Sequence, residues 1–283
     1  MQLSLEDQHR RALAFRELHT GPGAFVVANA WDAGTARLLT DLGFAALATT
    51  SAGLAFSLGR ADGADLVDRA EALANARAIV SATHLPVAAD LESGFGADAE
   101  AIAATIELAA EAGLVGGSIE DATGDPQAPI HSFEVAVERV GAAVAAARRL
   151  DLPFTVTARA ENFLHGRPDL ADTVRRLQAF EAAGADVLFA PGLPDAEAVR
   201  TVCAAVSRPV NVLAAGPLAE LTVQQLGELG ARRISVGSGF SRVALGAARR
   251  AADAVLRTGS FAALAEALPF GEANALMAGP ATD

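Results

Sequence analysis

The sequence predicts a single (β/α)8 barrel domain that covers residues 1–283. Three observations support this fold. Eight short apolar runs alternate with longer segments of helical periodicity, an order typical of parallel strands joined by crossover helices. The length of 283 residues suits a barrel, which takes about 250 residues. No linker-like change of composition divides the chain, so a second domain is not indicated.

The eight apolar runs define the expected strands. They are residues 24–30, 44–49, 86–91, 117–120, 154–158, 186–190, 209–213 and 232–236. The helical segments between them include residues 97–112, 133–150, 170–183 and 218–229. We also expect a leading helix within residues 3–18, a trailing helix at 260–268, and a helical C-terminal extension over about 240–283.

Glycine marks the junction between a helix and the next strand four times. Gly43, Gly113, Gly184 and Gly230 each follow a helical segment, at a position where a left-handed backbone favours a residue without Cβ. An open doubly wound sheet is the alternative arrangement. It would leave edge strands, and it usually begins with a glycine-rich phosphate turn, which is absent after Ala30. The closed barrel is therefore favoured.

The composition excludes several classes of enzyme. All 22 basic residues are arginine, and the chain has no lysine and no tyrosine. Schiff-base aldolases, pyridoxal enzymes and P-loop proteins are excluded, because each requires a lysine amine. The lone Cys203 excludes disulfide frameworks and multi-cysteine metal sites.

The charge pattern indicates neither a nucleic-acid partner nor a membrane. The net charge of −12 opposes binding to a phosphate backbone. No apolar run approaches the roughly 20 residues of a membrane span, and the charged N-terminus does not resemble a signal peptide. We therefore expect a cytoplasmic protein.

Acidic residues follow three consecutive predicted strands. Asp90 and Glu92 end the third run, Glu120 ends the fourth, and Glu161 follows the fifth. Residues two apart on a strand point to the same side, which is expected for Asp90 and Glu92, whereas Glu120 and Asp121 should point to opposite sides. Because the active site of a barrel lies at the C-terminal ends of its strands, we expect these carboxylates to share one rim.

Carboxylates gathered on one rim predict a bound cation, since uncompensated they would cost several kcal/mol in desolvation and repulsion. Oxygen ligands alone favour Mg²⁺ or Mn²⁺. The alternative is an ion-pair network in which Arg159 neutralises Glu161 or Glu120, although this leaves Asp90 and Glu92 unpaired. Arg159 could also hold a substrate carboxylate in a bidentate fork. A metal ion beside an arginine suggests a small 2-oxo or 2-hydroxy acid and an enolate stabilised by the cation.

A series of motifs in this chain resembles those of the isocitrate lyase and phosphoenolpyruvate mutase superfamily. The motifs are Asn-Ala-Trp-Asp at 29–32, Ala-Thr-Thr-Ser-Ala-Gly at 48–53, Leu-Gly-Arg-Ala-Asp at 58–62, Asp-Leu-Glu-Ser-Gly-Phe-Gly at 90–96, Ile-Glu-Asp at 119–121, Ala-Arg-Ala-Glu at 158–161 and Pro-Val-Asn-Val at 209–212. They cover nearly all of residues 20–245.

The resemblance implies a barrel whose last helix is swapped between subunits, in a homotetramer built as a dimer of dimers. It implies Mg²⁺ or Mn²⁺ held directly or through water by Asp62, Asp90, Glu92 and Glu120. It also implies that a small 2-oxo or 2-hydroxy carboxylate is bound by Thr50, Ser51, Ala52, Gly53, Asn211 and Arg159.

The loop after the Glu-Asp pair departs from the superfamily pattern. Isocitrate and methylisocitrate lyases carry a Lys-Lys-Cys-Gly-His loop whose cysteine supplies a proton, but residues 121–131 contain neither lysine nor cysteine. The mutases likewise use a lysine in this loop. The departure favours a lyase that cleaves or decarboxylates a small 2-oxo or 2-hydroxy dicarboxylate. Oxaloacetate is the simplest candidate, beside substrates similar to isocitrate or methylisocitrate.

We expect Arg159, Glu120 and His131 to be the catalytic residues. His131 lies in the loop at 122–132 and is a candidate proton donor, although a solvent-exposed loop histidine is an equal interpretation. Two alternative functions remain open. One is a phosphoenolpyruvate or phosphonopyruvate mutase or hydrolase, and the other is a non-catalytic protein that binds 2-oxo acids.

Overall fold

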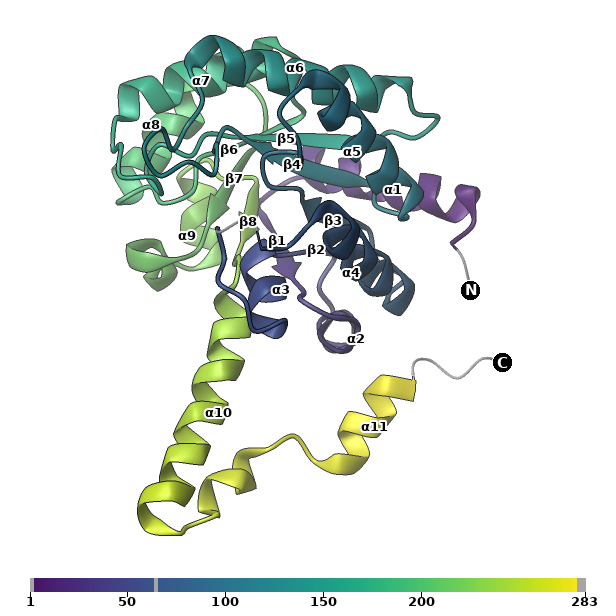
Figure 1. Cartoon of the computed structure of the whole chain (residues 1–283), viewed down its shortest axis with the longest axis vertical. Coiled ribbons are helices and arrows are strands. Elements are labelled where there is room, and N and C mark those ends of the chain that lie inside the picture. Colours follow the sequence, from purple (N-terminus) through teal and green to yellow (C-terminus); the bar gives the residue numbers. More distant parts are fainter. Residues whose placement is uncertain (1–2, 64–65, 279–283) are drawn as a thin grey trace.

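The barrel is closed by eight parallel strands in a computed structural model that describes residues 3–63 and 66–278 (Figure 1). The strands are β1 (Phe25–Asn29), β2 (Ala46–Ala48), β3 (Val87–Asp90), β4 (Gly116–Glu120), β5 (Thr155–Arg159), β6 (Val187–Phe189), β7 (Val210–Leu213) and β8 (Arg233–Ser235). Each strand pairs with its neighbours in sequence, and β1 pairs with β8. The predicted (β/α)8 barrel is confirmed, and the open sheet is excluded.

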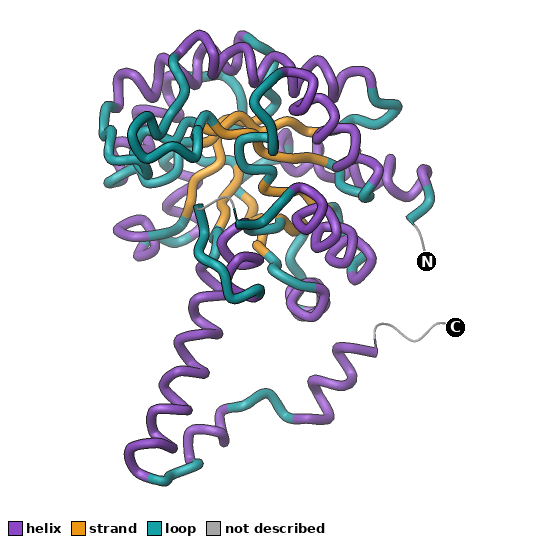
Figure 2. Tube along the Cα trace, viewed as in Figure 1, coloured by secondary structure: helices purple, strands orange, loops and turns teal. Residues whose placement is uncertain are grey.

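Helices surround the strands, which lie at the centre of the barrel (Figure 2). They are α1 (Leu5–Thr20), α2 (Ala33–Asp41), α3 (Ser51–Ser57), α4 (Arg69–Ala82), α5 (Ala99–Glu111), α6 (Phe133–Arg149), α7 (Leu170–Ala182), α8 (Ala196–Ala205), the 3₁₀ helix η1 (Gly216–Glu220), α9 (Val223–Glu228), α10 (Gly239–Thr258), the 3₁₀ helix η2 (Ala262–Glu266) and α11 (Phe270–Ala278).

Acidic caps fix the start of most outer helices. Asp32, Asp68, Asp98, Asp169 and Asp195 each accept a hydrogen bond from a backbone N–H in the first turn of the helix that follows. Such a cap typically contributes about 1 kcal/mol. At the other end, the four junction glycines all have positive φ, as their spacing predicts.

Two predicted helices differ from the structure. Residues 218–229 form η1 and α9 rather than one helix, and Pro217 stands at the start of η1. Residues 260–268 contain only the short η2, because a residue before proline disfavours the helical conformation and Pro269 follows. The last five residues of the predicted C-terminal extension, 279–283, lie outside the described residues.

Apolar side chains form two layers, one outside and one inside the barrel. Leu47, Ile119 and Leu188 point outward and pack beneath the surrounding helices. Inside the barrel, small residues such as Ala46 and Ala88 pack near the N-terminal end. Barrel interiors are usually filled by larger branched side chains, so this interior leaves room for a cavity above.

Helix α1 closes the N-terminal end of the barrel. Phe15 is fully buried there, and His19 packs edge-on against both Phe15 and Phe25. The Nδ1–H of His19 donates to the backbone oxygen of Phe15 at 2.7 Å. Burial lowers the pKa of His19 to about 3, and the positive charges of Arg233 and Arg232 also lower it.

Acid should therefore destabilise the protein through His19. Because the folded-state pKa is depressed, the stabilising contribution is complete above pH 6.5 and is lost as the pH falls from 6.5 towards 3. The proton that the unfolded state binds at this histidine lowers the free energy of unfolding by about 1.4 kcal/mol per pH unit within this range. We expect His19→Leu to remove this part of the slope in urea unfolding between pH 7 and 4.5. His84→Gln, at an exposed position, should leave the slope unchanged, and an unchanged slope in His19→Leu would contradict the assignment.

No helix within residues 3–63 and 66–278 has both the length and the apolar character that crossing a bilayer requires.

Candidate active site

A cavity of about 180 Å³ lies inside the C-terminal half of the barrel. Asp62, Asp90 and Arg159 line its upper part, and Thr157 and Arg233 line its lower part. Pockets for drug-sized ligands measure roughly 300–1,000 Å³. The cavity therefore suits a small molecule of a few heavy atoms.

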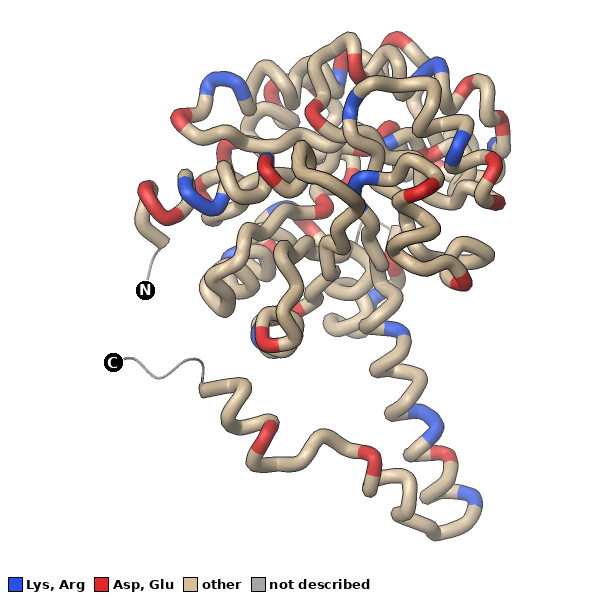
Figure 3. Tube along the Cα trace, turned by 180° about the vertical axis from the view of Figure 1, so that it is seen from behind, with Lys and Arg blue, Asp and Glu red and all other residues tan. Residues whose placement is uncertain are grey.

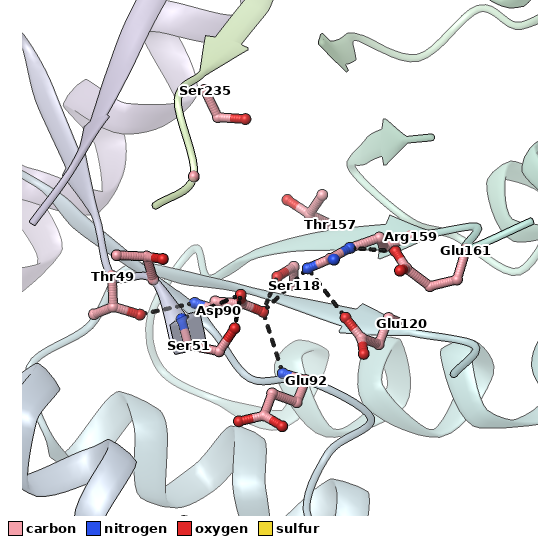
Figure 4. Close-up of polar contacts among 12 residues, drawn as sticks. Thr49, Ser51, Asp90, Glu92, Ser118, Glu120, Thr157, Arg159, Glu161 and Ser235 are labelled. Atoms are coloured by element: carbon pink, nitrogen blue, oxygen red, sulfur yellow. Dashed lines mark hydrogen bonds and ion pairs between the residues drawn. The ribbon is translucent and has the colours of Figure 1, made fainter. Parts of the chain in front are cut away.

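The side chain of Asp90 is held by donors from three neighbouring segments (Figure 4). One carboxylate oxygen accepts hydrogen bonds from the hydroxyl of Ser51 at 3.0 Å and from its backbone N–H at 3.5 Å. The other oxygen accepts from the N–H of Glu92 at 3.3 Å and from the hydroxyl of Ser118 at 3.5 Å. This arrangement fixes Asp90 at the cavity wall.

Arg159 lies at the centre of the acidic rim and contacts three carboxylates. Its guanidinium is 3.0 Å from Glu120 and 3.4 Å from Asp90, and its Nε donates to Glu161. The same group lies over the ring of Phe189, 5.4 Å from the ring centroid. The ion-pair network considered from the sequence is therefore present, and it includes Asp90. These three contacts use the Nε and Nη1 atoms of the guanidinium.

The rim carries more negative charge than one arginine can balance. Burial raises the pKa of Glu120 well above its usual range; Arg159 opposes this rise, whereas the charges of Glu161, Asp90 and Glu92 add to it. Burial also raises the pKa of Asp62, and the neighbouring Asp90 raises it further. Such raised values are typical of carboxylates crowded without enough positive charge.

A divalent cation fits this donor set in its chemistry and charge. In the described part of the chain, no three side chains of histidine, cysteine, aspartate or glutamate already converge on one point. Mg²⁺, however, keeps several waters and typically takes only one or two protein carboxylates. Asp90 as a direct ligand, with Asp62 and Glu120 reached through water, meets that requirement.

Glu92 does not point to the same side as Asp90, so this expectation was wrong. Strand β3 ends at Asp90, and Glu92 adopts a left-handed conformation with φ of 49°, which stops the alternation of side chains. Glu92 lines a second cavity together with Thr123 and His131. Figure 4 shows its carboxylate directed away from Arg159. A role for Glu92 in metal binding remains a prediction.

Glu120 and Asp121 point to opposite sides, as predicted. Glu120 faces Arg159 inside the barrel, whereas Asp121 accepts hydrogen bonds from Arg176 at 2.9 Å and from the N–H of Glu161 at 2.8 Å. Burial raises the pKa of Asp121 to about 6. Asp121 thus ties the ends of β4 and β5 to helix α7 and helps to hold the rim in place.

His131 lies away from the cavity that contains Asp90. The backbone N–H of His131 donates to the backbone oxygen of Asp121 at 2.8 Å, and the backbone oxygen of His131 accepts from Arg176 at 3.1 Å. The preceding loop closes on itself through an antiparallel bridge between Ala122 and Ile130. Burial lowers the pKa of the His131 ring, which lines the second cavity. Its role as a proton donor remains a prediction.

Most of the predicted substrate-binding residues line the cavity, but Gly53 does not. Thr50, Ser51, Ala52 and Asn211 are in its wall. The N–H of Gly53 donates to the hydroxyl of Thr50 at 3.2 Å and so caps helix α3. A Cβ at Gly53 would lie 2.5 Å from the Thr50 methyl group, so glycine is required there for close packing.

Sequence reasoning missed several residues in the cavity wall. Ser118 contacts Asp90, Phe189 lies beneath Arg159, and Arg233 lies in the lower wall. Arg233 had a detectable signal, because it alternates with Ser235 on one side of the three-residue strand Arg-Ile-Ser. Charged residues are rare inside a strand that is covered on both faces.

An acid-lined cavity at the C-terminal mouth of a (β/α)8 barrel is the arrangement of an enzyme that acts on a small molecule. The profile of the phosphoenolpyruvate phosphomutase family matches residues 15–256 of this chain. The chain therefore belongs to this family and, with it, to the isocitrate lyase and phosphoenolpyruvate mutase superfamily of carbon-carbon lyases and mutases. The predicted family and the predicted enzyme class are confirmed.

Relatives in this family carry several activities. The oxaloacetate decarboxylase of Bradyrhizobium diazoefficiens is 32% identical over 209 residues, which are 71% of this chain and 70% of that protein. A solved structure from Burkholderia cenocepacia J2315, assigned no more narrowly than lyase/mutase, is 53% identical, with a TM-score of 0.94 and coverage of 97% and 98% of the two chains. Phosphonopyruvate hydrolase, solved with oxalate and Mg²⁺, is 26% identical, with a TM-score of 0.84 and 95% coverage of each chain.

Proposed function

We propose that this protein is a Mg²⁺-dependent lyase that cleaves or decarboxylates a small 2-oxo or 2-hydroxy dicarboxylate, with oxaloacetate as the first candidate. The observation that carries the proposal is the Asp90 carboxylate, fixed in a small cavity whose acids exceed the charge of Arg159. The chain has no lysine, so a cation must supply the electron withdrawal that an amine supplies elsewhere. The likeness to an oxaloacetate decarboxylase supports the same substrate class.

Different residues at this site have different roles. When bound, Mg²⁺ or Mn²⁺ would polarise the 2-oxo acid end of the substrate and stabilise the negative charge of an enolate. Ser51 and Ser118 hold Asp90 in one orientation, so the carboxylate needs little rearrangement. Arg159 offsets the charge of Glu120 and Glu161. Thr157 and Arg233 in the lower wall are buried, and burial strengthens electrostatic contacts there.

The test is turnover on two substrates with and without Mg²⁺. We expect carbon dioxide and pyruvate from oxaloacetate, above the rate of metal-catalysed decarboxylation without enzyme, and loss of this activity in EDTA. Faster turnover of phosphonopyruvate, followed by phosphorus NMR, would reverse the ranking in favour of the mutase or hydrolase reaction. Binding of oxalate with Mg²⁺ in calorimetry, without turnover of either substrate, would favour a 2-oxo acid binding protein.

The mutase or hydrolase reaction stays as the second candidate because of one observation. Phosphonopyruvate hydrolase shares the fold with a TM-score of 0.84, and its structure contains oxalate and Mg²⁺. Against it, the loop at 122–132 lacks the lysine that the resemblance leads us to expect in mutases.

We further propose that a second copy of the chain covers the C-terminal arm, defined as residues 239–278, which contain α10, η2 and α11. The arm projects from the barrel before α11 returns beside α2 (Figure 1). Ser241 is the only buried residue recorded in α10, and α11 has none. Half of the 16 large hydrophobic side chains exposed in the described residues lie on this arm, among them Leu256 and Phe270. Figure 3 shows mostly uncharged positions along it. Exchange of α10 or α11 between subunits, as in a homotetramer, would bury this surface.

Light scattering tests the assembly. We expect a mass of two or four times 28.7 kDa for the wild-type protein, and a shift towards the monomer in a Leu256→Asp, Phe270→Asp double variant. Leu164→Asp, which is exposed on the barrel instead of the arm, serves as the matched control and should keep the wild-type mass. A wild-type monomer at micromolar concentration would contradict the proposal.

A reducing, cytoplasmic setting is also proposed, because Cys203 is the only cysteine and is a free thiol.

A further inference from the structure

A second arginine lies in the lower wall of the active-site cavity. Arg233 begins strand β8, and only 6% of its surface is exposed. Its Nε donates to the side-chain oxygen of Asn211 at 2.9 Å, and one terminal nitrogen donates to the hydroxyl of Thr157 at 3.0 Å. Both partners are neutral. The guanidinium is thus held in one orientation and faces the cavity.

Arg233 has no acidic partner within residues 3–63 and 66–278. Asp90, Glu120 and Glu161 pair with Arg159, and no ion pair of the described residues involves Arg233. Burial lowers the pKa of Arg233 to about 9, and no carboxylate of the described residues raises it. A buried cation without a counter-ion is costly, typically by several kcal/mol. A cavity that admits an anion offers the missing partner.

The two arginines occupy successive layers of the barrel. Thr157, which contacts Arg233, and Arg159 are two residues apart on β5 and point to the same side. A strand rises about 3.3 Å per residue, so the layers are about 7 Å apart. Small residues such as Ala48 and Ala88 line the cavity, which leaves the path between the layers open. A four-carbon chain can bridge such a distance with an acid group at each end.

We propose that Arg233 binds the distal carboxylate of a dicarboxylate substrate whose 2-oxo or 2-hydroxy acid end lies beside Asp90. This assignment rests on the proposed function and adds to it a specificity-determining residue that no motif indicated. It accounts for the cation in the lower wall, since a bound substrate supplies the counter-ion. It also separates the two ends of the substrate, because the upper acids favour a cation and Arg233 favours an anion.

Calorimetry with two 2-hydroxy acids tests the subsite. L-malate and 2-hydroxybutyrate share the 2-hydroxy acid end and the four-carbon chain, and differ in the distal carboxylate. With Mg²⁺, we expect the wild-type protein to bind L-malate about 10- to 100-fold more tightly, as for a hydrogen-bonded charge pair. Arg233→Met should abolish this preference by weakening L-malate binding, with 2-hydroxybutyrate binding within about twofold of wild type. Arg233→Lys should restore part of it.

Control variants distinguish the subsite from a structural role. Arg232→Met changes the neighbouring arginine, which bonds the backbone of Gly23 outside the cavity, and should leave both affinities unchanged. An equal loss of both ligands in Arg233→Met would mean that Arg233 only holds the barrel in shape, and would overturn the proposal. An unchanged preference in Arg233→Met would overturn it as well.

The experiments distinguish a failure of the proposed function, which needs Mg²⁺ at Asp90, from a failure of the Arg233 subsite. Wild-type protein that binds neither probe with Mg²⁺ would contradict the proposed function. The lower wall is then tested by a bromide soak of wild-type crystals, because this anion needs no metal. An anomalous peak beside the Arg233 guanidinium, absent in Arg233→Met, is the expected result. Wild-type crystals without such a peak would overturn the subsite.

Discussion

Asp90→Ala is expected to lower kcat/KM for oxaloacetate in the presence of Mg²⁺ by at least about 1,000-fold. A Lewis-acid cation contributes several kcal/mol to transition-state stabilisation, and each 1.4 kcal/mol corresponds to a factor of ten in rate. Asp90 is the carboxylate that lines the cavity and is fixed by Ser51 and Ser118, so its loss removes the central ligand. The measurement is steady-state turnover at several Mg²⁺ concentrations.

Asp90→Asn provides the more demanding version of this experiment. The amide keeps the shape of the side chain but removes its charge, and we expect the same loss of activity. The free energy of unfolding should stay the same or increase. The variant removes one negative charge from a crowded acidic rim, in which the charge of Asp90 raises the pKa of Glu120 and Asp62. Glu228→Ala, at an exposed position remote from the cavity, should behave as wild type. Full activity in Asp90→Asn would remove Asp90 from the proposed site.

Arg159→Met is expected to lower the free energy of unfolding by about 3–5 kcal/mol, the usual cost of removing one partner from a buried ion pair. Removal of the guanidinium leaves Glu161, of which 1% is exposed, without its partner. It also removes the positive charge that faces Glu120 and Asp90. Urea unfolding at pH 7 measures the effect. Arg200→Met, which breaks an exposed ion pair with Glu197, should cost less than about 1 kcal/mol.

A double-mutant cycle separates this electrostatic effect from lost packing. In the background of Glu161→Gln, Arg159→Met should cost clearly less, because the buried charge that it leaves unpaired is already gone. Equal costs in the two backgrounds would contradict the view that Arg159 acts mainly by balancing the carboxylates. Its packing over Phe189 would then dominate.

The fold was predictable because its signals are local and repeated. Most strands are apolar runs, and each of the four junction glycines has a positive φ that few other residues adopt. The opposite directions of Glu120 and Asp121 followed from strand alternation alone, since both lie at the regular end of β4. Regular backbone makes side-chain direction predictable.

The site was less predictable where the backbone is irregular or where contacts join distant strands. Glu92 follows the end of β3 in a left-handed conformation, so alternation gave the wrong direction. His131 is drawn to Asp121 and Arg176 by contacts across 10 and 45 residues of sequence, which no local pattern reveals. The strand pattern marks Arg233 as unusual, but its place in the cavity wall follows from the closure of the barrel by β8 against β1.

The central claim is that Asp90 binds a divalent cation together with the acid end of the substrate. The most direct measurement is a crystal structure with Mn²⁺ and oxalate, in which the anomalous signal locates the ion. We predict a peak about 2.1 Å from an Asp90 carboxylate oxygen, the distance typical of Mg²⁺, with oxalate completing the coordination. Absence of any peak near Asp90 at saturating Mn²⁺, with Arg159 still bridging Asp90 and Glu120, would contradict the claim.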